Sequence, residues 1–461
     1  MGQALSRYRD LSLWHATLSE GIAAADDLVP RAPLDGDTVA DVAIIGAGLT
    51  GLWTAYYLSE RDRALRIVVL DKEIAGFGAS GRNGGWCSAL FPRSTASLER
   101  AHGREPALAM RRAMIDTVDE VGRVSGAEGI DCDFIRGGTL AFARSEPQLS
   151  AARADVAEAV RYGVDELELR EGGRGPIGTR AVVFDPACAR IHPAKLVRGL
   201  ARTVAARGVT IAEETEALDW EPGTVRTRRG NVTAQAVIQA TEGYGATLTR
   251  THRAILPLYS LMIATEPLPD SFWRDAGIEH GQTFTDYRHL LIYGQRTADN
   301  RFAFGGRGAR YHWGSAIRSG YDRSPRVFEH LRRTLVELFP AAADARVTHR
   351  WGGPIGVPRD WHASVRFDPV TGLGSAGGYV GDGLSTTNLA GRTLADLVTG
   401  TDSALVSLPW VNHESPSWEP EPLRFVGANL GLAAMGVADV EENLTRRASV
   451  VAKLMAPLVG H

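Results

Sequence analysis

Lysine and cysteine are both scarce in this sequence of 461 residues. Of the 51 basic residues only Lys72, Lys195 and Lys453 are lysines, and the others are arginines. Three cysteines in so long a chain do not make a disulfide framework, and no Cys-x-x-Cys pair indicates a zinc site. We therefore expect neither a structural disulfide nor a bound metal.

A strong net charge and a long apolar run are also missing. The 51 basic and 54 acidic residues leave a net charge of −3, which gives no reason to expect binding to nucleic acid or to a membrane surface. The charged segment 1–20 does not look like a signal peptide, and no run reaches the roughly 18 apolar residues of a transmembrane helix. We expect a cytoplasmic protein of two domains, and the sequence leaves its oligomeric state open.

The sequence does contain a strand–turn–helix–strand unit near its start. The apolar runs 42–45 and 65–70 are typical of buried strands, and residues 52–58 between them form the apolar face of a helix. Helices are also predicted at 193–207 and 384–397, each beside further glycine-rich or strand-like segments, and an amphipathic helix is predicted near 437–455. Segments of a dinucleotide-binding fold thus occur at the start, in the middle and near the end of the chain.

This order predicts an α/β protein in which one domain is discontinuous in sequence. We assign residues 1–130, 190–250 and 350–461 to a discontinuous Rossmann-like domain that binds a dinucleotide. Residues 131–189 and 251–349, where apolar and polar residues alternate, are assigned to an α+β substrate-binding domain with a mostly antiparallel sheet.

The turn after the first strand has the glycine spacing of a dinucleotide-binding motif. Gly46 permits a tight turn, Gly48 lets the backbone approach a pyrophosphate, and Gly51 lets the following helix pack closely. Asp71 follows the second strand, at the place where a carboxylate can accept hydrogen bonds from both hydroxyls of a ribose. A glycine-rich turn that binds nothing is the alternative, but Asp71 favours a nucleotide site.

Two further glycine-rich segments favour FAD over NAD. The loop 76–86 is flexible enough to lie flat against a large planar ligand, and Ser80, Arg82 and Asn83 in it supply donors for a pyrophosphate. A flexible surface loop is the alternative. The segment 377–383 opens a helix whose N-terminus would stabilise negative charge on a flavin, and a simple NAD-binding domain has no use for this element.

Several spaced blocks of the sequence match the motifs of one known family. They include IIGAGLTGL, GFGASGRNGGW, HPAKLVRGLA and GGYVGDGLSTTNLAGRTLADL. In these blocks the chain resembles the D-amino-acid-oxidase-like FAD-dependent oxidoreductases, which include glycine and sarcosine oxidases, and especially the γ-glutamylputrescine oxidase branch. The resemblance implies that the Rossmann-like domain at 1–130, 190–250 and 350–461 is an FAD-binding domain of the glutathione-reductase type. The resemblance implies that FAD is bound by Gly46, Ala47, Gly48, Leu49, Thr50, Asp71, Lys72, Gly78, Ala79, Ser80, Arg82, Asn83, Gly84, Gly85, Ala217, Thr241, Gly243, Gly381, Asp382, Gly383, Leu384 and Ser385.

The same resemblance implies a reaction. Such enzymes oxidise the C–N bond of a small amine or amino acid by hydride transfer to flavin N5; the imine hydrolyses and O2 is reduced to H2O2. A catalytic base is not required if the amine arrives unprotonated, so no catalytic side chain is assigned. The alternatives are a dehydrogenase that uses another electron acceptor and a flavin-binding partner protein without turnover.

Two departures from the family pattern concern the flavin. Some sarcosine oxidase relatives attach it to a cysteine late in the chain, whereas the last cysteine here is Cys188, so we expect non-covalent FAD. Such relatives also place a lysine above the flavin to activate oxygen, and the matching position here is Ala303. None of the three lysines is placed to substitute, and this motivates the dehydrogenase alternative.

The substrate pocket is predicted from one strand face. Arg301, Ala303, Gly305 and Arg307 alternate along the run 301–307 and share a face. If Ala303 faces the flavin, Arg307 reaches the pocket and binds a carboxylate or phosphonate of the substrate; a structural salt bridge is the alternative. Further candidates for the pocket wall, each with core packing as its alternative, are Tyr259, Met262, Tyr293 and Trp351.

Overall fold

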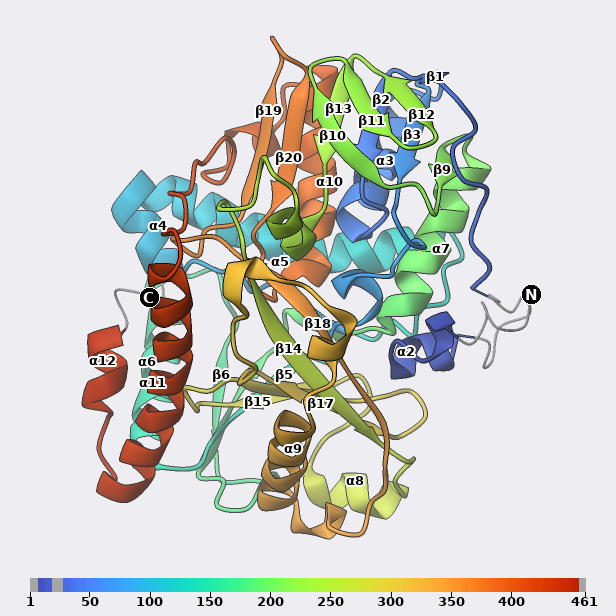
Figure 1. Cartoon of the computed structure of the whole chain (residues 1–461). Coiled ribbons are helices and arrows are strands. Elements are labelled where there is room, and N and C mark those ends of the chain that lie inside the picture. Colours follow the sequence, from blue (N-terminus) through green and yellow to red (C-terminus); the bar gives the residue numbers. More distant parts are fainter. Residues whose placement is uncertain (1–6, 19–27, 456–461) are drawn as a thin grey trace.

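The computed structural model of the chain describes residues 7–18 and 28–455 and is built around two large β-sheets (Figure 1). The first has six strands in the order β19-β20-β13-β2-β3-β9, and all neighbours are parallel except β19 and β20. Its strands are β2 (Val42–Ile45), β3 (Ile67–Leu70), β9 (Thr210–Ala212), β13 (Ala236–Gln239), β19 (Ser364–Asp368) and β20 (Leu373–Gly377).

Both faces of the first sheet are covered, as expected for apolar parallel strands. Val42 and Ile44 of β2 point into the core formed with the helices, whereas Ala43 and Ile45 point into a second core on the opposite face. The helices are α3 (Leu49–Arg61), α5 (Arg104–Ala127), α7 (Pro193–Ala206) and α10 (Gly383–Thr399). A small sheet covers the other face with strands β1 (Thr38–Val39), β10 (Ala217–Glu221), β11 (Thr224–Thr227) and β12 (Gly230–Thr233).

The second sheet has eight strands in the order β18-β14-β17-β16-β15-β5-β7-β6, antiparallel except between β15 and β5. Phe302 and Phe304 face a core shared with α9 (Pro325–Leu338), whereas Ala303 faces the opposite side. The strands are β5 (Thr139–Ala143), β6 (Glu168–Glu171), β7 (Ala181–Asp185), β14 (Leu256–Thr265), β15 (Thr283–Asp286), β16 (Ile292–Arg296), β17 (Phe302–Gly306) and β18 (Val347–Val357).

The N-terminal arm packs against the glycine-rich loop that follows β3. The indole of Trp14, in the short helix α2 (Leu13–Ala16), donates to the carbonyl of Asn83 at 2.8 Å. The Ser12 hydroxyl donates to the carbonyl of Gly81 at 3.2 Å. The arm therefore fixes the loop from outside, a role that its sequence does not indicate.

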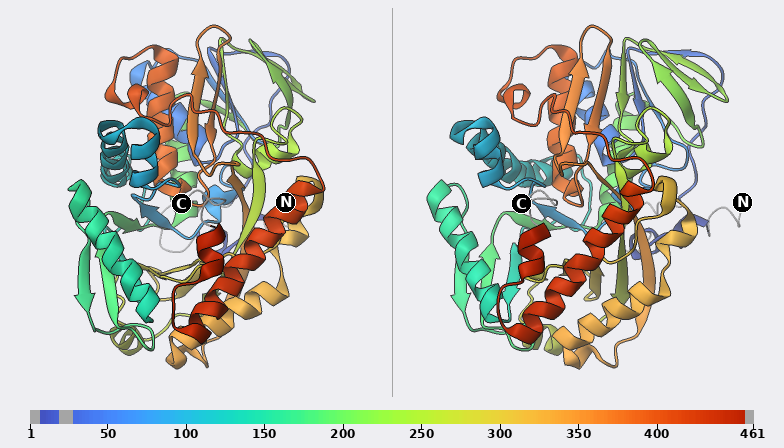
Figure 2. Two further views of the ribbon diagram at one scale, coloured as in Figure 1. Left: turned by 90° about the vertical axis from the view of Figure 1, so that its left-hand side faces the viewer. Right: turned by 60° about the vertical axis from the view of Figure 1, so that its left-hand side comes forward.

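The C-terminal part of the chain forms α11 (Leu423–Thr445) and α12 (Val450–Met455), which lie side by side across the outside of the second sheet (Figure 2). The stretch Leu423–Glu442 has a mean hydropathy of 1.3 and is long and apolar enough to cross a membrane by length and composition. This differs from the sequence expectation. Arg424 and Asp439 interrupt the apolar residues, so no unbroken run is visible.

Candidate functional site

A cavity of about 520 Å³ lies at the carboxyl ends of β2, β3 and β13 and reaches the first turn of α10. Ligands of open α/β sheets bind at this edge. The residues predicted from the sequence that line it are Gly46, Gly48, Leu49, Thr50, Asp71, Lys72, Gly78, Ala79, Ser80, Asn83, Ala217, Thr241, Gly381, Gly383 and Leu384. The predicted residues that lie outside this lining are Ala47, Arg82, Gly84, Gly85, Gly243, Asp382 and Ser385.

The turn between β2 and α3 accepts only glycine at two places. Gly46 has φ of +111°, and a Cβ atom there would lie 2.5 Å from the carbonyl oxygen of Ala240. A Cβ atom on Gly51 would lie 2.0 Å from the carbonyl oxygen of Gly46. Helix α3 begins after Gly48, which has no side chain to cap it; the N–H of Leu49 donates to the Ser80 hydroxyl at 2.8 Å, and the first turn of the helix lies beside the cavity.

Asp71 fastens this turn to the end of β3. Its Oδ2 accepts from the backbone N–H of Ala47 at 2.7 Å, and its Oδ1 accepts from that of Glu73 at 2.8 Å. Burial raises the pKa of Asp71 to about 6, against the lowering effect of these two N–H groups. Each carboxylate oxygen has a further lone pair, so the side chain can hold the turn and also accept from a ligand in the cavity.

Glu242, which the sequence interpretation missed, connects three segments around the cavity. Its Oε2 accepts from the N–H of Gly378 at 2.8 Å, and its Oε1 accepts from that of Gly356 at 3.2 Å. Burial raises the pKa of Glu242 to about 7 in spite of these bonds. The only signal in the sequence is an acidic residue inside the glycine-containing segment 240–245, directly after a buried strand.

Arg82 and Asn83 have protein partners in the structure. The Arg82 guanidinium donates to Asp322 at 2.7 Å and to the Tyr244 hydroxyl at 2.7 Å, so it joins the glycine-rich loop to the connection between β17 and α9 and to the connection between β13 and β14. The Asn83 amide donates to the carbonyl of Ala79 at 3.1 Å. Both side chains thus shape the loop, and Asn83 also lines the cavity.

Three of the candidate pocket residues lie in one row across four neighbouring strands of the second sheet. Trp351 pairs with Met262, Met262 with Gly305, and Gly305 with Tyr293. A Cβ atom on Gly84 would lie 2.6 Å from the Tyr293 ring, so this face meets the glycine-rich loop.

Tyr259 is separate from the other three. It is three residues before Met262 on β14 and points into the core on the opposite face of the sheet, where its ring contacts His312 and Tyr321. Because side chains alternate along a strand, Tyr259 and Met262 cannot form the wall of the same pocket there.

Arg307 lies directly after β17, beside the segment that opens α10. Its Nη2 donates to the carbonyl of Val380 at 2.8 Å, and its guanidinium lies 5.3 Å from the ring centre of Trp361. Gly381, which lines the cavity, is the next residue after Val380. Burial lowers the pKa of Arg307, although the nearby Asp382 carboxylate opposes this shift without forming an ion pair with Arg307.

The chain is similar to proteins of known name and structure. The family model for FAD dependent oxidoreductases matches residues 41–397. The chain is 30% identical over 396 residues to gamma-glutamylputrescine oxidoreductase from Escherichia coli, covering 83% of this chain and 89% of that protein. It is 29% identical over 412 residues to a probable oxidoreductase, OrdL, from Rhizobium meliloti, covering 85% and 91%.

Solved structures show the same fold. Glycine oxidase from Geobacillus kaustophilus matches with a TM-score of 0.68 at 21% identity, covering 82% of this chain and 99% of that one. The predicted fold class, a Rossmann-like domain combined with an α+β domain, is confirmed.

Proposed function

Because the chain belongs to the family of FAD dependent oxidoreductases, we propose that it oxidises the carbon–nitrogen bond of a small amine or amino acid, with FAD held in the cavity beside Gly46. The resemblance to this family predicted from the motifs is confirmed. The observation that carries the proposal is one continuous cavity that joins the glycine turn, the Asp71 carboxylate and the start of α10. These are the parts that a dinucleotide with a flavin ring requires.

The residues around the cavity fit FAD held without a covalent bond. Gly46 leaves room where a side chain would collide with Ala240, and Asp71 can accept from a ribose. Cys87, Cys132 and Cys188 all lie in the described part of the chain, all are buried, and none of them lines the cavity. This supports the expectation that no cysteine is linked to the flavin.

When bound, the flavin would accept a hydride from the carbon next to the substrate nitrogen. The residues of the chain then have to orient the substrate and keep water away. Met262, Ala303 and Trp351 form an apolar cluster on the sheet face toward the glycine-rich loop and suit the exclusion of water. Arg307, beside Gly381, is placed to hold an anionic group of the substrate. No side chain is proposed as a base.

The proposed electron acceptor is dioxygen, which is reduced to H2O2, while the imine product is hydrolysed. The proposed location of the protein is the cytoplasm. One observation favours a second candidate function, a dehydrogenase with another acceptor. Ala303 is fully buried, at the position where the resemblance to some sarcosine oxidases implies an oxygen-activating lysine. Lys72 instead pairs with Glu216, and Lys195 pairs with Asp133.

Purified protein tests these proposals directly. It should be yellow, and denaturation by acid or heat should release intact FAD into the supernatant. A panel of amines and amino acids is then screened for anaerobic bleaching of the flavin absorbance. With a bleaching substrate, oxygen uptake and H2O2 formation support an oxidase, whereas reduction of a dye without oxygen uptake supports a dehydrogenase. Flavin that stays on the precipitated chain contradicts non-covalent binding.

A further inference from the structure

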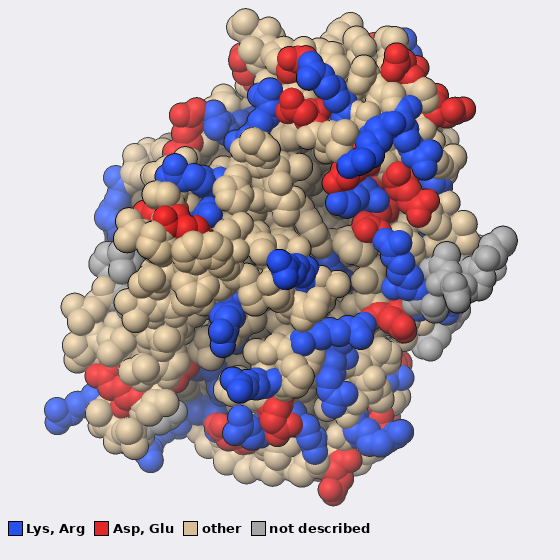
Figure 3. Space-filling model, in the orientation of Figure 1, with Lys and Arg blue, Asp and Glu red and all other residues tan. Residues whose placement is uncertain are grey.

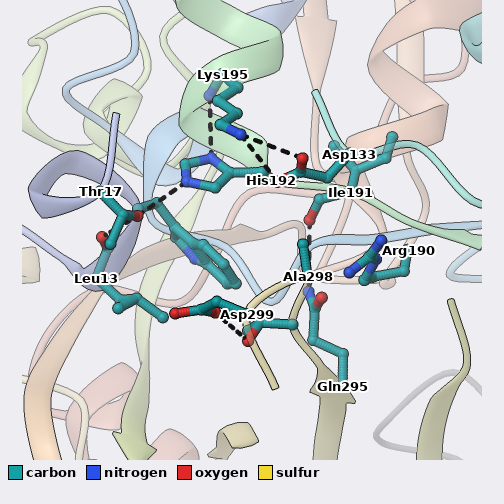
Figure 4. A pocket seen from close by; sticks show the side chains of 12 residues that line it. Leu13, Thr17, Asp133, Arg190, Ile191, His192, Lys195, Gln295, Ala298 and Asp299 are labelled. Carbon is teal, nitrogen blue, oxygen red and sulfur yellow. Dashed lines mark hydrogen bonds and ion pairs between the residues drawn. The ribbon is translucent and has the colours of Figure 1, made fainter. Parts of the chain in front are cut away.

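A second cavity, of about 220 Å³, lies between the N-terminal arm, the start of α7 and the end of β16 (Figure 4). Its walls include Trp14 of the arm, Arg190 and His192 before α7, Lys195 in the first turn of α7, and Gln295 of β16. Within the described chain it shares no lining residue with the larger cavity.

Arg190 is the unusual member of this wall. Only 2% of the residue is exposed, and its Nε and Nη1 have no hydrogen-bond partner among residues 7–18 and 28–455. In Figure 4 its guanidinium points toward Ala298 inside the pocket, and no dashed line joins it to another side chain. Burial lowers the pKa of Arg190. A buried cation without a partner is strongly unfavourable, so the site is expected to receive an anion.

The other charged groups at this cavity already have partners. Lys195 donates to both carboxylate oxygens of Asp133 at 3.1 Å, and Asp299 pairs with Arg301. Arg296, on β16 nearby, pairs with Asp270. Asp133 and Asp299 also attract Arg190 through space, but among the described residues neither forms a hydrogen bond or an ion pair with its guanidinium.

His192 does not compensate the positive charge of Arg190. Its Nδ1 accepts from the N–H of Lys195 at 3.2 Å, and its Nε2 lies 3.0 Å from the Thr17 hydroxyl. Burial lowers the pKa of His192 well below its ordinary value, so the ring is neutral near pH 7. A partner that bonds directly to the Arg190 guanidinium is therefore expected to be a bound ligand.

We propose that this cavity is a binding site for a small carboxylate, held by the guanidinium of Arg190. A guanidinium presents parallel N–H groups that match the two oxygens of a carboxylate. The cavity is smaller than the roughly 300–1,000 Å³ of drug-sized ligand pockets, which limits the ligand to a few heavy atoms. Leu13, Trp14 and Ile191 supply an apolar wall for its carbon atoms.

A hydrogen bond connects this second cavity to the glycine-rich loop beside the larger cavity. The Gln295 amide in its wall donates to the carbonyl of Gly84 at 2.6 Å, in the loop that the flavin is proposed to touch. A bound carboxylate is therefore expected to perturb the flavin absorbance as well as to stabilise the protein. Only the absorbance readout depends on the proposed function.

Titration of the purified holoenzyme tests the site. Acetate, pyruvate and succinate are compared with inorganic phosphate, by calorimetry and by the rise in Tm. We expect at least one carboxylate to bind saturably. The affinity for this carboxylate should fall more than tenfold in R190Q, and R190K should restore little of it. R296Q is the matched control, because Arg296 already has Asp270, and it should keep the binding.

The unliganded R190Q variant should be at least as stable as the wild type, because it loses an unpaired buried charge. Wild-type affinity in R190Q overturns the assignment, and so does saturable binding of phosphate without any carboxylate. The absence of binding by every probe also overturns it. Since calorimetry and Tm do not need turnover, these outcomes are independent of whether an amine is oxidised.

A different observation concerns α11, whose inner and outer faces are both apolar. Phe425, Ala428 and Leu432 pack inward on a cluster that contains Leu256 and Val357. On the outer face, six large side chains are between 54% and 78% exposed, and the surface over α11 at the left of Figure 3 is mostly uncharged. These six residues are Leu423, Val426, Leu430, Val437, Val440 and Leu444.

The outer face has the spacing of a coiled-coil seam. With exposed Ala433 included, steps of three and four residues alternate along its whole length, which gives a narrow stripe of the a/d type. Gly427, Ala434 and Gly436 beside the stripe are small, so another helix can approach closely. Membrane-surface helices have a broad apolar face edged by lysine and arginine, and 425–445 contains neither residue.

We infer that a second copy of this chain packs its α11 along the same stripe. The stripe is about 30 Å long, and an apolar patch of this extent is unusual on a monomer. A two-fold dimer pairs one surface with itself, which a self-complementary seam permits. Neighbouring surfaces of both copies would complete the roughly 800 Å² per subunit of a stable interface.

The mass of the holoenzyme in solution tests this inference. Sedimentation equilibrium should give a dimer for the wild type and a monomer for the double variant L430K/V437K, with unchanged flavin content. V370K is the matched control, because Val370 is 92% exposed away from α11, and it should remain dimeric. A monomeric wild type overturns the inference. Flotation with phosphatidylcholine–phosphatidylglycerol vesicles that L430K/V437K abolishes would instead assign the stripe to a membrane.

Discussion

The two cavities of this protein are built from different parts of the chain. The dinucleotide turn of the larger one is built from backbone, where Gly46 leaves space and Asp71 and Glu242 fasten the neighbouring segments. The smaller one depends on side chains, among which the Arg190 guanidinium has no bonded partner in the described chain. We therefore expect the larger cavity to lose its ligand when a side chain is added to one of its glycines. The smaller cavity should lose its ligand when the charge of Arg190 is removed.

The largest effect is expected from G46A. The new Cβ atom would lie 2.5 Å from the Ala240 carbonyl oxygen in a backbone with φ of +111°. Overpacking costs about 1–3 kcal/mol, and the forced backbone conformation costs about as much again. FAD content after purification should fall to near zero. The control G126A adds a Cβ to a helix where nothing lies within 4 Å and should be neutral or slightly stabilising. Full FAD retention in G46A would contradict a backbone-built site.

The variant D71A tests whether a side chain contributes to FAD binding in the larger cavity. D71A should lose hydrogen bonds to the ribose worth about 1.5–3 kcal/mol each, less what water recovers. It also frees the N–H groups of Ala47 and Glu73, so Tm should fall together with FAD affinity. Fluorescence titration of the stripped protein with FAD gives the affinity. If D71A binds FAD as the wild type does, the nucleotide site has been assigned wrongly.

Variants of Arg307 test whether a positive charge beside the larger cavity binds the substrate. R307A should raise KM far more than it lowers kcat, the pattern of lost uniform binding. The loss reaches about 3–5 kcal/mol if a buried ion pair is broken. R307K should recover little, since lysine has no bidentate fork.

The matched control for this prediction is R301A on the same strand, because Arg301 already pairs with Asp299. Steady-state kinetics with the best substrate, and with an analogue that lacks its anionic group, check the prediction. Equal losses for both compounds, or an uncharged best substrate, would make Arg307 a structural residue.

The smallest effect is expected from the protonation of Glu242. With a pKa of about 7 in the folded chain and an ordinary value of 4.5, Glu242 holds a proton in the native state that the unfolded state releases. Its contribution to stability is complete below pH 4.5 and is lost as the pH rises through 7. The Tm of FAD-free protein should thus fall by a few degrees between pH 5 and pH 8. E242Q should flatten this slope, and an unchanged slope would place the titration elsewhere.

Local features of the sequence were enough to predict the larger cavity. The motif spans a short stretch of the chain, from Gly46 and Gly51 to Asp71. The turn has no room for side chains at two positions, and this requirement can be recognised in the sequence because both positions are glycine. Apolar runs located β2, β3, α3 and α10 for the same reason, because buried parallel strands and apolar-faced helices have characteristic periods. The C-terminal helix was placed less well, since the prediction near 437–455 missed that α11 begins at Leu423.

Contacts between distant segments decided the rest. Arg190 has no bonded carboxylate because Asp133 bonds to Lys195 and Asp299 bonds to Arg301. Glu242 joins segments that lie more than a hundred residues apart in the sequence. Tyr259 and Met262 are separated by the alternation of a strand whose register only the folded sheet fixes. The sequence by itself was enough to propose the cofactor site beside Gly46. The tertiary structure alone decided where charges remain unpaired, because pairing depends on which side chains converge.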